Sequence, residues 1–333
     1  MKTHPRIAEQ VEEPSFDDVL AARRVIEPHL PRTPFYESIS LGRMLGLTLF
    51  IKYENHQPVG AFKVRGTVNK VLNLTAEERA RGVVTGSMGN HGQGVCYGAR
   101  LIGVHATVVM PEKANHDKVE AMRNLGAEVV FHGEGFEEAS ERAMELEREK
   151  GFVYFHAAND PWIVAGHGTI GLEMLEDVPD LDALVVPVGA GGLISGVALA
   201  AKTLNPVIEI IGVQAKNCAP FYRSRREGRL VESESARTFA EGLASRTPTA
   251  LPFRMIDRLV DDLVVATEEE LRRAIVLLLE KTHNVAEGAG GAGTAGVVQL
   301  RDRLAGKRVG TILSGGNLPR PMLERALTDP DSW

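Results

Sequence analysis

Apolar and polar positions follow two series in which short strands alternate with amphipathic helices. Strand-like runs of the first series lie at 83–86, 105–110, 128–131 and 152–155, and helical patterns separate them at 91–102, 115–125 and 136–149. Strand-like runs of the second series lie at 183–188, 208–214, 262–266 and 308–313, with helical patterns at 192–203, 268–282 and 291–304. This βαβα order predicts parallel sheets covered by helices.

The two series predict two structural units. We expect a small, mobile unit over residues 81–155 and a large, discontinuous unit over residues 1–80 and 156–333. Right-handed crossovers place the carboxyl ends of parallel strands along one edge, so a ligand is expected there. The chain stops at Trp333, and we expect no appended C-terminal regulatory domain.

Polar residues at helix starts support two of the expected helices. Ser15 is a candidate cap for a helix over residues 15–30. Thr267 and Glu270 form a capping-box pattern at the start of the helix over residues 268–282.

Composition and charge narrow the class of protein. Hydrophobic residues make up 44% and charged residues 25% of the 333 positions, which is typical of a globular protein. A net charge of -6 argues against nucleic acid or an anionic membrane as a partner. No apolar run approaches the roughly 20 residues that span a bilayer. Two cysteines and a start without the apolar core of a signal peptide predict a cytoplasmic protein without disulfides.

Lys63 is the first candidate for chemistry. It follows a strand-like segment over residues 48–55 and a turn at Val59-Gly60, and it begins a helical pattern with Phe62 beside it. A lysine at such a place can lose hydration, which lowers its pKa and suits Schiff-base chemistry. These residues alone also fit a solvated lysine in the first turn of a helix.

Three later glycine-rich stretches each follow a strand-like run. They are Ser87-Met88-Gly89-Asn90-His91-Gly92-Gln93-Gly94, Val188-Gly189-Ala190-Gly191-Gly192-Leu193 and Leu313-Ser314-Gly315-Gly316-Asn317. In the second, backbone amides at the start of a helix favour a phosphate, although a tight strand-to-helix turn explains it equally well. Its spacing matches neither common nucleotide-binding pattern.

Together with Ala61-Phe62-Lys63-Val64-Arg65-Gly66, these stretches resemble the signature set of the fold-type II pyridoxal-phosphate enzymes. The motifs occur in the expected order over nearly the whole chain and are most similar to those of threonine/serine dehydratases and serine racemase. The resemblance implies an α/β architecture of two open, twisted parallel-sheet domains, like that of the tryptophan synthase beta subunit, and pyridoxal 5'-phosphate as cofactor.

The resemblance also implies a set of site residues. Lys63 holds the cofactor as a Schiff base beside Phe62, Asn90 binds its phenolic oxygen and Ser314 faces its pyridine nitrogen. The phosphate lies on the loop formed by Gly189, Ala190, Gly191, Gly192 and Leu193. The substrate carboxylate is bound by the loop formed by Ser87, Met88, Gly89, Asn90 and His91.

Two of these residues bear on the reaction. A hydroxyl such as that of Ser314 stabilises a protonated ring less than a carboxylate does, which favours prompt loss of a β-leaving group. Met88 stands where the racemase has a serine that carries a second proton. Methionine cannot carry a proton, so we expect an enzyme with one base and not a racemase.

Other positions depart from the family pattern. Ala190 replaces a glycine and is tolerated if its φ is negative. Gln214 stands where relatives have a metal-binding carboxylate, so no metal site is expected. His167 replaces a common glutamine, and we interpret it as a histidine at a helix start. The role of Glu287, in a segment similar to the family's glutamate-bearing one, stays open.

The sequence therefore predicts a dehydratase that converts L-threonine or L-serine to a 2-keto acid and ammonia, with Lys63 as the base. Two alternatives are another β-hydroxy amino acid as substrate, such as 3-hydroxyaspartate or phenylserine, and a β-replacement reaction. The departures at Ala158, His167 and Gln214 are compatible with either. A non-enzymatic binding protein is a third alternative. The family's habit implies a homodimer or homotetramer, and the expected partner is a small amino acid.

Overall fold

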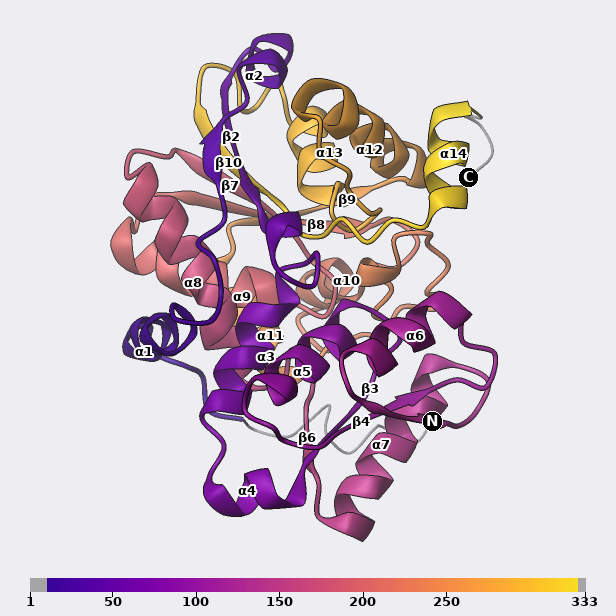
Figure 1. Cartoon of the computed structure of the whole chain (residues 1–333). Helices are drawn as coiled ribbons and strands as arrows, with labels where there is room; N and C mark the ends of the chain where they lie inside the picture. Colours follow the sequence, from indigo (N-terminus) through magenta and orange to yellow (C-terminus); the bar gives the residue numbers. More distant parts are fainter. Residues whose placement is uncertain (1–10, 329–333) are drawn as a thin grey trace.

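The computed structural model describes residues 11–328, which form two sheets (Figure 1). The six-stranded sheet has the order β1 (Phe35–Glu37), β2 (Thr48–Tyr53), β10 (Arg308–Leu313), β7 (Ala183–Pro187), β8 (Glu209–Ala215) and β9 (Asp262–Ala266). The four-stranded sheet has the order β5 (Glu128–Phe131), β4 (Ala106–Met110), β3 (Val83–Gly86) and β6 (Val153–Tyr154). Neighbouring strands run parallel except β1 and β2. The predicted α/β fold with two parallel sheets is confirmed, with β1 as an antiparallel edge strand of the larger one.

Helices cover both faces of the large sheet. One face packs against α2 (Ile39–Leu45), α12 (Glu268–Thr282) and α13 (Ala292–Gln299). The other face packs against α8 (Pro161–Asp177), α9 (Gly192–Leu204) and α11 (Ala250–Leu259). The central strands β7, β8 and β10 are almost completely buried, as the continuous apolar runs predict for a parallel sheet.

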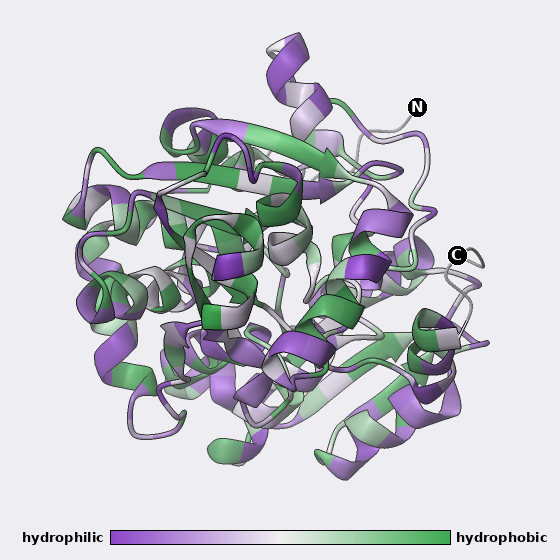
Figure 2. Ribbon diagram, turned by 90° about the horizontal axis from the view of Figure 1, so that it is seen from above, coloured by the Kyte–Doolittle hydropathy of each residue, from purple (hydrophilic) through white to green (hydrophobic). Residues whose placement is uncertain are grey.

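The small sheet has the same layered arrangement. Helices α5 (Asn90–Leu101) and α6 (His116–Asn124) cover one face, and α7 (Phe136–Lys150) covers the other. Helix α3 (Lys63–Leu72) packs against both α5 and α8, and so connects the two units. Figure 2 shows hydrophobic residues along the strands and hydrophilic residues on the outer helices.

The structure corrects several helix predictions. Helix α1 (Phe16–Ile26) ends before residue 30 because the chain turns there toward Pro31, and α13 ends at Gln299, where turns replace the predicted continuation to residue 304. The polar section around 222–235 contains α10 (Pro220–Glu227). The sequence pattern missed α8 because residues 163–175 are buried on all sides, which leaves no polar face. Remaining elements are α4 (Ala76–Arg81), α14 (Arg320–Thr328) and the 3-10 turns η1 (Glu54–His56) and η2 (Glu241–Leu243).

Both predicted helix caps are present. Ser15 and Asp18 form a capping box at α1, and Thr267 and Glu270 form one at α12. Across residues 11–328, no helix combines the length and the apolar character that crossing a membrane requires.

Candidate active site

Lys63 begins α3 next to the end of β10. The backbone N–H of Phe62 donates to the carbonyl of Ser314 at 3.0 Å, and Ala61 pairs with Gly315 in an antiparallel bridge. Since β10 lies beside β2 in the sheet, two motifs that are 250 residues apart meet at the carboxyl ends of neighbouring strands. The first and last predicted site segments therefore lie together.

The Lys63 amine is partly buried. Its Nζ lies 3.4 Å from the carbonyl oxygen of Ala157 and 5.0 Å from the centre of the Phe62 ring. Loss of water lowers the pKa of Lys63 to about 8, although the carboxylate of Glu287 acts in the opposite direction. The amine is thus less hydrated than a solvated lysine in a first helical turn.

The glycine loop between β7 and α9 leaves the start of the helix open. Gly191 precedes α9 with a φ of 89°, and no side chain caps the helix. A Cβ at Gly189 would collide with the carbonyl oxygen of Gly242. Ala190 does not have a positive φ, so its methyl group is tolerated. Within residues 11–328, no side-chain hydrogen bond caps this helix start, and such a start suits an anionic group such as a phosphate.

The glycine loop and Lys63 share a neighbour. A Cβ at Gly192 would lie 3.4 Å from the same Ala157 oxygen that Lys63 contacts, and 3.2 Å from the Cβ of Ala158. Leu193 is the buried second residue of α9. Lys63 and the start of α9 therefore both lie next to the carbonyl of Ala157, which suits a single cofactor that carries an aldehyde and a phosphate. The residues present fit pyridoxal phosphate.

The loop after β3 is held by its own serine. The Ser87 Oγ accepts hydrogen bonds from the amides of Gly89 and Gly92, at 3.3 and 3.1 Å. Met88 packs against the core of the small unit, and Gly89 has open space where a Cβ would stand. The His91 Nε2 hydrogen-bonds the carbonyl of Phe155 at 3.1 Å, and burial lowers the pKa of His91 to about 3, so its ring is neutral.

Two further site residues have well-defined partners. The buried Ser314 hydroxyl donates to the carbonyl of Ala289 at 3.2 Å. The amide of Asn90 donates to the Oε1 of Glu287 at 2.6 Å. Removal from water raises the pKa of Glu287 to about 7, while the bond from Asn90 lowers it. Sequence reasoning left Glu287 without a role.

The interpretation of His167 as a helix-start residue is wrong. Helix α8 begins at Pro161, so His167 lies in its interior, fully buried, with its ring 4.8 Å from that of Phe62. Burial and the charge of Lys63 hold the pKa of His167 well below its usual range. The ring is neutral and packs against the Phe62 ring in an edge-to-face contact.

Gln214 has a structural partner. Its Oε1 accepts the amide of Tyr222, near the start of α10, at 2.8 Å. Between residues 11 and 328, no group of three or more histidine, cysteine or acidic side chains is arranged to hold a metal ion.

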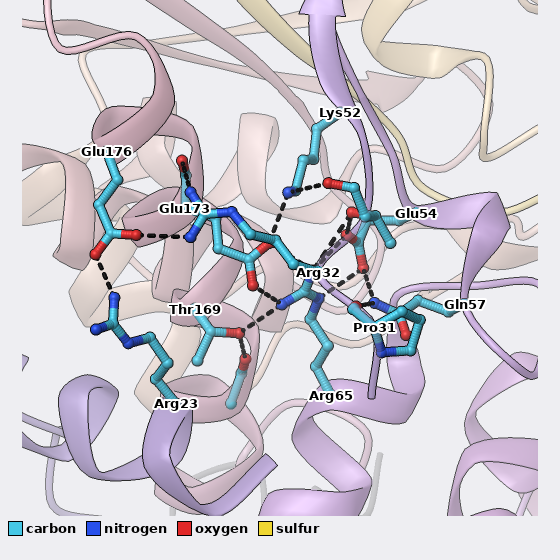
Figure 3. A network of polar contacts seen from close by, with 12 residues as sticks. Arg23, Pro31, Arg32, Lys52, Glu54, Gln57, Arg65, Thr169, Glu173 and Glu176 are labelled. Carbon is cyan, nitrogen blue, oxygen red and sulfur yellow. Dashed lines mark hydrogen bonds and ion pairs between the residues drawn. The ribbon is translucent and has the colours of Figure 1, made fainter. Parts of the chain in front are cut away.

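Buried charges surround Arg65, which lies near Lys63 in α3 (Figure 3). Arg65, two residues further along α3, bonds Glu54 of η1 and Glu173 of α8, and Lys52 of β2 also bonds Glu173. All four side chains are almost inaccessible to water. The network ties the start of α3 to the large sheet and its helix layer.

Residues 26–315 match the family model of pyridoxal-phosphate dependent enzymes. The chain belongs to this family. It is 44% identical over 313 residues to an L-threonine ammonia-lyase of Thermotoga maritima, covering 94% of this chain and 78% of the relative. It is 36% identical to the catabolic L-threonine dehydratase of Escherichia coli K12, covering 91% of this chain and 93% of the relative.

Solved structures agree with this family membership. Maize serine racemase superposes with a TM-score of 0.90 at 33% identity, covering 95% of this chain and 97% of that one. A threonine deaminase from Solanum lycopersicum has a TM-score of 0.90 at 31% identity, covering 98% and 94%. The fold-type II architecture and the pyridoxal-phosphate dependence predicted from the motifs are confirmed.

Proposed function

We propose that this chain is a pyridoxal-phosphate dependent L-threonine/L-serine ammonia-lyase. The observation that carries the proposal is a partly buried lysine amine 3.4 Å from the carbonyl oxygen of Ala157, which also lies next to Gly192 at the uncapped start of α9. The names of the similar proteins from Thermotoga maritima and Escherichia coli support threonine as the substrate.

The residues that would hold the cofactor come from four segments. They are Lys63, the backbone of residues 189–193, Asn90 and Ser314. When bound, pyridoxal phosphate withdraws electrons from the substrate Cα and so weakens its C–H bond. The hydroxyl of Ser314 offers the ring less charge stabilisation than a carboxylate would, which favours elimination over a long-lived carbanion.

Lys63 is the proposed base. Because its pKa is lowered to about 8, a useful fraction of the amine is neutral near pH 7–8 and can accept the α-proton. The Ala157 carbonyl and the Phe62 ring position the amine on one side of the site.

The loop at residues 87–91 is the proposed carboxylate site. Ser87 already binds the amides of Gly89 and Gly92, which fixes the start of α5. Within residues 11–328, the amides of Asn90 and His91 have no such partner and remain for a ligand. A helix start binds a carboxylate well, and fixing that group aligns the Cα–H bond for removal.

Met88 argues for elimination over racemisation. A thioether neither donates nor accepts a proton, so a second base is missing at the position where a racemase needs one. After the α-proton and the β-hydroxyl leave as water, the released enamine takes up water and yields a 2-keto acid and ammonia. The reaction is balanced, because the elimination releases one water molecule and the hydrolysis of the enamine takes up one.

We also propose that residues 81–155 move as a unit and close over the substrate. Two ion pairs support this proposal, because they link the small unit to the segment before α11 and would hold the closed position. Lys118 of α6 pairs with Glu241 at 2.5 Å, and Arg246 pairs with Glu137 of α7 at 3.2 Å. A cytoplasmic homodimer or homotetramer is our proposal for the assembly, and exposed apolar residues on β1 and α2, namely Tyr36, Ile39 and Met44, support it.

The deciding experiment is the release of 2-keto acid from a panel of L-threonine, L-serine, D-serine, a 3-hydroxyaspartate and a phenylserine. Rapid release from L-threonine or L-serine, without formation of D-serine, is the expected result. If both are inert while another member reacts, the proposed substrate is wrong and the elimination stands. If a protein that carries the cofactor releases no 2-keto acid from any member of the panel, the proposed elimination is wrong.

A further inference from the structure

Asn317, in the last glycine-rich motif, uses both of its amide hydrogens. Its Nδ2 donates to the carbonyl of Val59 and to the Oδ1 of Asn90, at 2.8 Å in each case. A carbonyl can only accept, so the bond to Val59 fixes which end of the Asn317 amide is the donor. The same bond fixes the Oδ1 of Asn90 as an acceptor.

Glu287 fixes the other end of the Asn90 amide. The Nδ2 of Asn90 donates one hydrogen to the Oε1 of Glu287 at 2.6 Å, a short hydrogen bond. A flipped Asn90 would bring two oxygens together at Glu287 and two NH₂ groups together at Asn317. Both neighbours therefore oppose the flip, and one N–H of Asn90 is left for a further acceptor.

The glycine turn makes this arrangement possible. A Cβ at Gly315 would lie 2.6 Å from the Oε1 of Glu287 and 3.2 Å from the Nδ2 of Asn90. The amide of Glu287 also donates to the carbonyl of Gly315 at 3.1 Å. Any side chain at position 315 would separate the pair, so glycine there serves the meeting of Asn90 and Glu287.

We propose that Glu287 and Asn317 are positioning residues, which orient the amide of Asn90 so that its second N–H binds the ring oxygen of pyridoxal phosphate. In this role the negative charge of Glu287 also favours the protonated form of the cofactor groups beside that oxygen. The inference rests on the proposed function only for the presence of the cofactor, since it does not depend on which amino acid reacts.

The surroundings of Glu287 make its charge sensitive near neutral pH. Loss of water raises the pKa of Glu287 to about 7. The charged groups that act on it are Lys63 of α3, Lys118 of α6 and Glu241 of η2. Lys63 in turn is held more tightly protonated by Glu287. Carboxyl and lysine are thus coupled across the site, with Asn90 bonded to the carboxyl.

Two variants separate orientation from charge. In Glu287→Gln, an amide oxygen can still accept the hydrogen of Asn90, but the negative charge is gone. In Asn317→Asp, a carboxylate replaces the donor and faces the Oδ1 of Asn90, so the orientation is lost. Glu241→Gln is the matched control, because it removes a carboxylate that acts on the same group without a hydrogen bond to Asn90.

The experiment combines a pH titration of the visible band of the bound cofactor with the dissociation constant of pyridoxal phosphate from each cofactor-free variant. Glu287→Gln is expected to move the titration midpoint down by about one pH unit, the size of effect that a neighbouring charge has. Asn317→Asp is expected to weaken cofactor binding about tenfold or more, the equivalent of one lost, oriented hydrogen bond. Glu241→Gln should leave the affinity nearly unchanged and should not move the midpoint down, because it removes a charge that raises the pKa of Glu287 and keeps the bond between Glu287 and Asn90.

Unchanged midpoint and affinity in both variants overturn the proposal, and so does a shift in Glu241→Gln as large as that in Glu287→Gln. Thermal unfolding of the cofactor-free proteins identifies a variant that fails to fold. In that case Asn317→Ala, which removes the donor without adding a charge, must reproduce the loss of affinity. If the midpoint and the affinity change as expected in a protein that releases no 2-keto acid, the proposed function is refuted and this inference stands.

Discussion

The guanidinium of Arg65 holds the carboxylate of Glu173 through two parallel hydrogen bonds, of 2.6 and 2.9 Å. The same guanidinium bonds Glu54 at 2.8 Å, and Lys52 bonds Glu173 at 2.6 Å (Figure 3). Two positive and two negative charges therefore compensate one another in a region that water does not reach. Because Arg65 follows Lys63 by two residues, this network fixes the direction in which the lysine leaves α3.

Breaking the network should be costly. In Arg65→Met, Glu54 and Glu173 keep only Lys52 as a buried counter-charge, and we expect a loss of about 3–5 kcal/mol in the free energy of unfolding. Urea unfolding of the cofactor-free protein measures it. Arg32→Ala is the control, since its pairs with Glu176 and Asp177 are solvent-exposed and such pairs contribute about 1 kcal/mol or less. Equal losses in the two variants would refute a special role for Arg65.

The glycine loop should tolerate no side chain at its third position. Gly191 has a φ of 89°, where a non-glycine residue costs roughly 1–3 kcal/mol, and a Cβ there would press on Pro252 and Phe221. If that strain falls on the cofactor-binding conformation, Gly191→Ala weakens pyridoxal phosphate binding about 5- to 150-fold. Equilibrium titration of the cofactor-free protein gives the dissociation constant.

Gly103→Ala supplies the matched comparison for the loop. Gly103 has a similar φ of 68° with open space around it, and it lies between α5 and β4, away from the loop. This variant should lose a similar stability and keep its affinity. A loss of affinity in both variants would mean that general destabilisation, and not the shape of the loop, is responsible.

Much of the fold could be predicted because most of its strands are buried on both faces. Such strands are continuous apolar runs, and they alternate with helices that have one polar face. Burial also explains why α8 was missed. Because residues 163–175 are all buried, this helix has no polar face and its sequence shows no helical period. The antiparallel edge strand β1 was missed because it has only three residues, two of them exposed.

The candidate site was predictable to the extent that its residues stand at strand ends. Lys63, Ser314 and the 189–193 loop met because the parallel strands of the large sheet place their carboxyl ends on one edge. The 87–94 loop follows β3 of the small sheet and reaches them through the bonds of Asn90 to Glu287 and Asn317. Pairings within the site were not predictable. Asn90 and Glu287 are 197 positions apart, and Lys52 and Glu173 are 121 apart, so no local pattern connects them. The residue types alone did not give Glu287 a role.

Substitution of Lys63 tests the base directly. Lys63→Ala removes the amine, and Lys63→Arg keeps a charge that cannot be given up, because a guanidinium stays protonated. Both should lower the rate of 2-keto acid release by at least about 10²- to 10⁴-fold, the contribution of a positioned base, and both should lack the visible band of the lysine-bound cofactor. Near-normal turnover in either variant would remove Lys63 from the mechanism.

His167 should make the protein less stable in acid. The histidine is neutral in the fold because its pKa is held well below the ordinary value of about 6.5. A group with a lowered pKa stabilises the fold above its unfolded pKa, and this contribution is lost as the pH falls, because the unfolded chain then binds the proton. The free energy of unfolding should fall by about 1.2 kcal/mol from this residue alone between pH 6 and 5, where the unfolded histidine is mostly protonated. His91 and the buried carboxylates also make the free energy of unfolding depend on pH, so the comparison with His167→Gln isolates the contribution of His167. Urea unfolding of both cofactor-free proteins measures it. The decrease in the free energy of unfolding between pH 6 and 5 should be smaller by that amount in the variant. Equal slopes would mean that His167 is protonated in the folded protein as readily as in the unfolded chain, which its complete burial against Phe62 and Gly66 opposes.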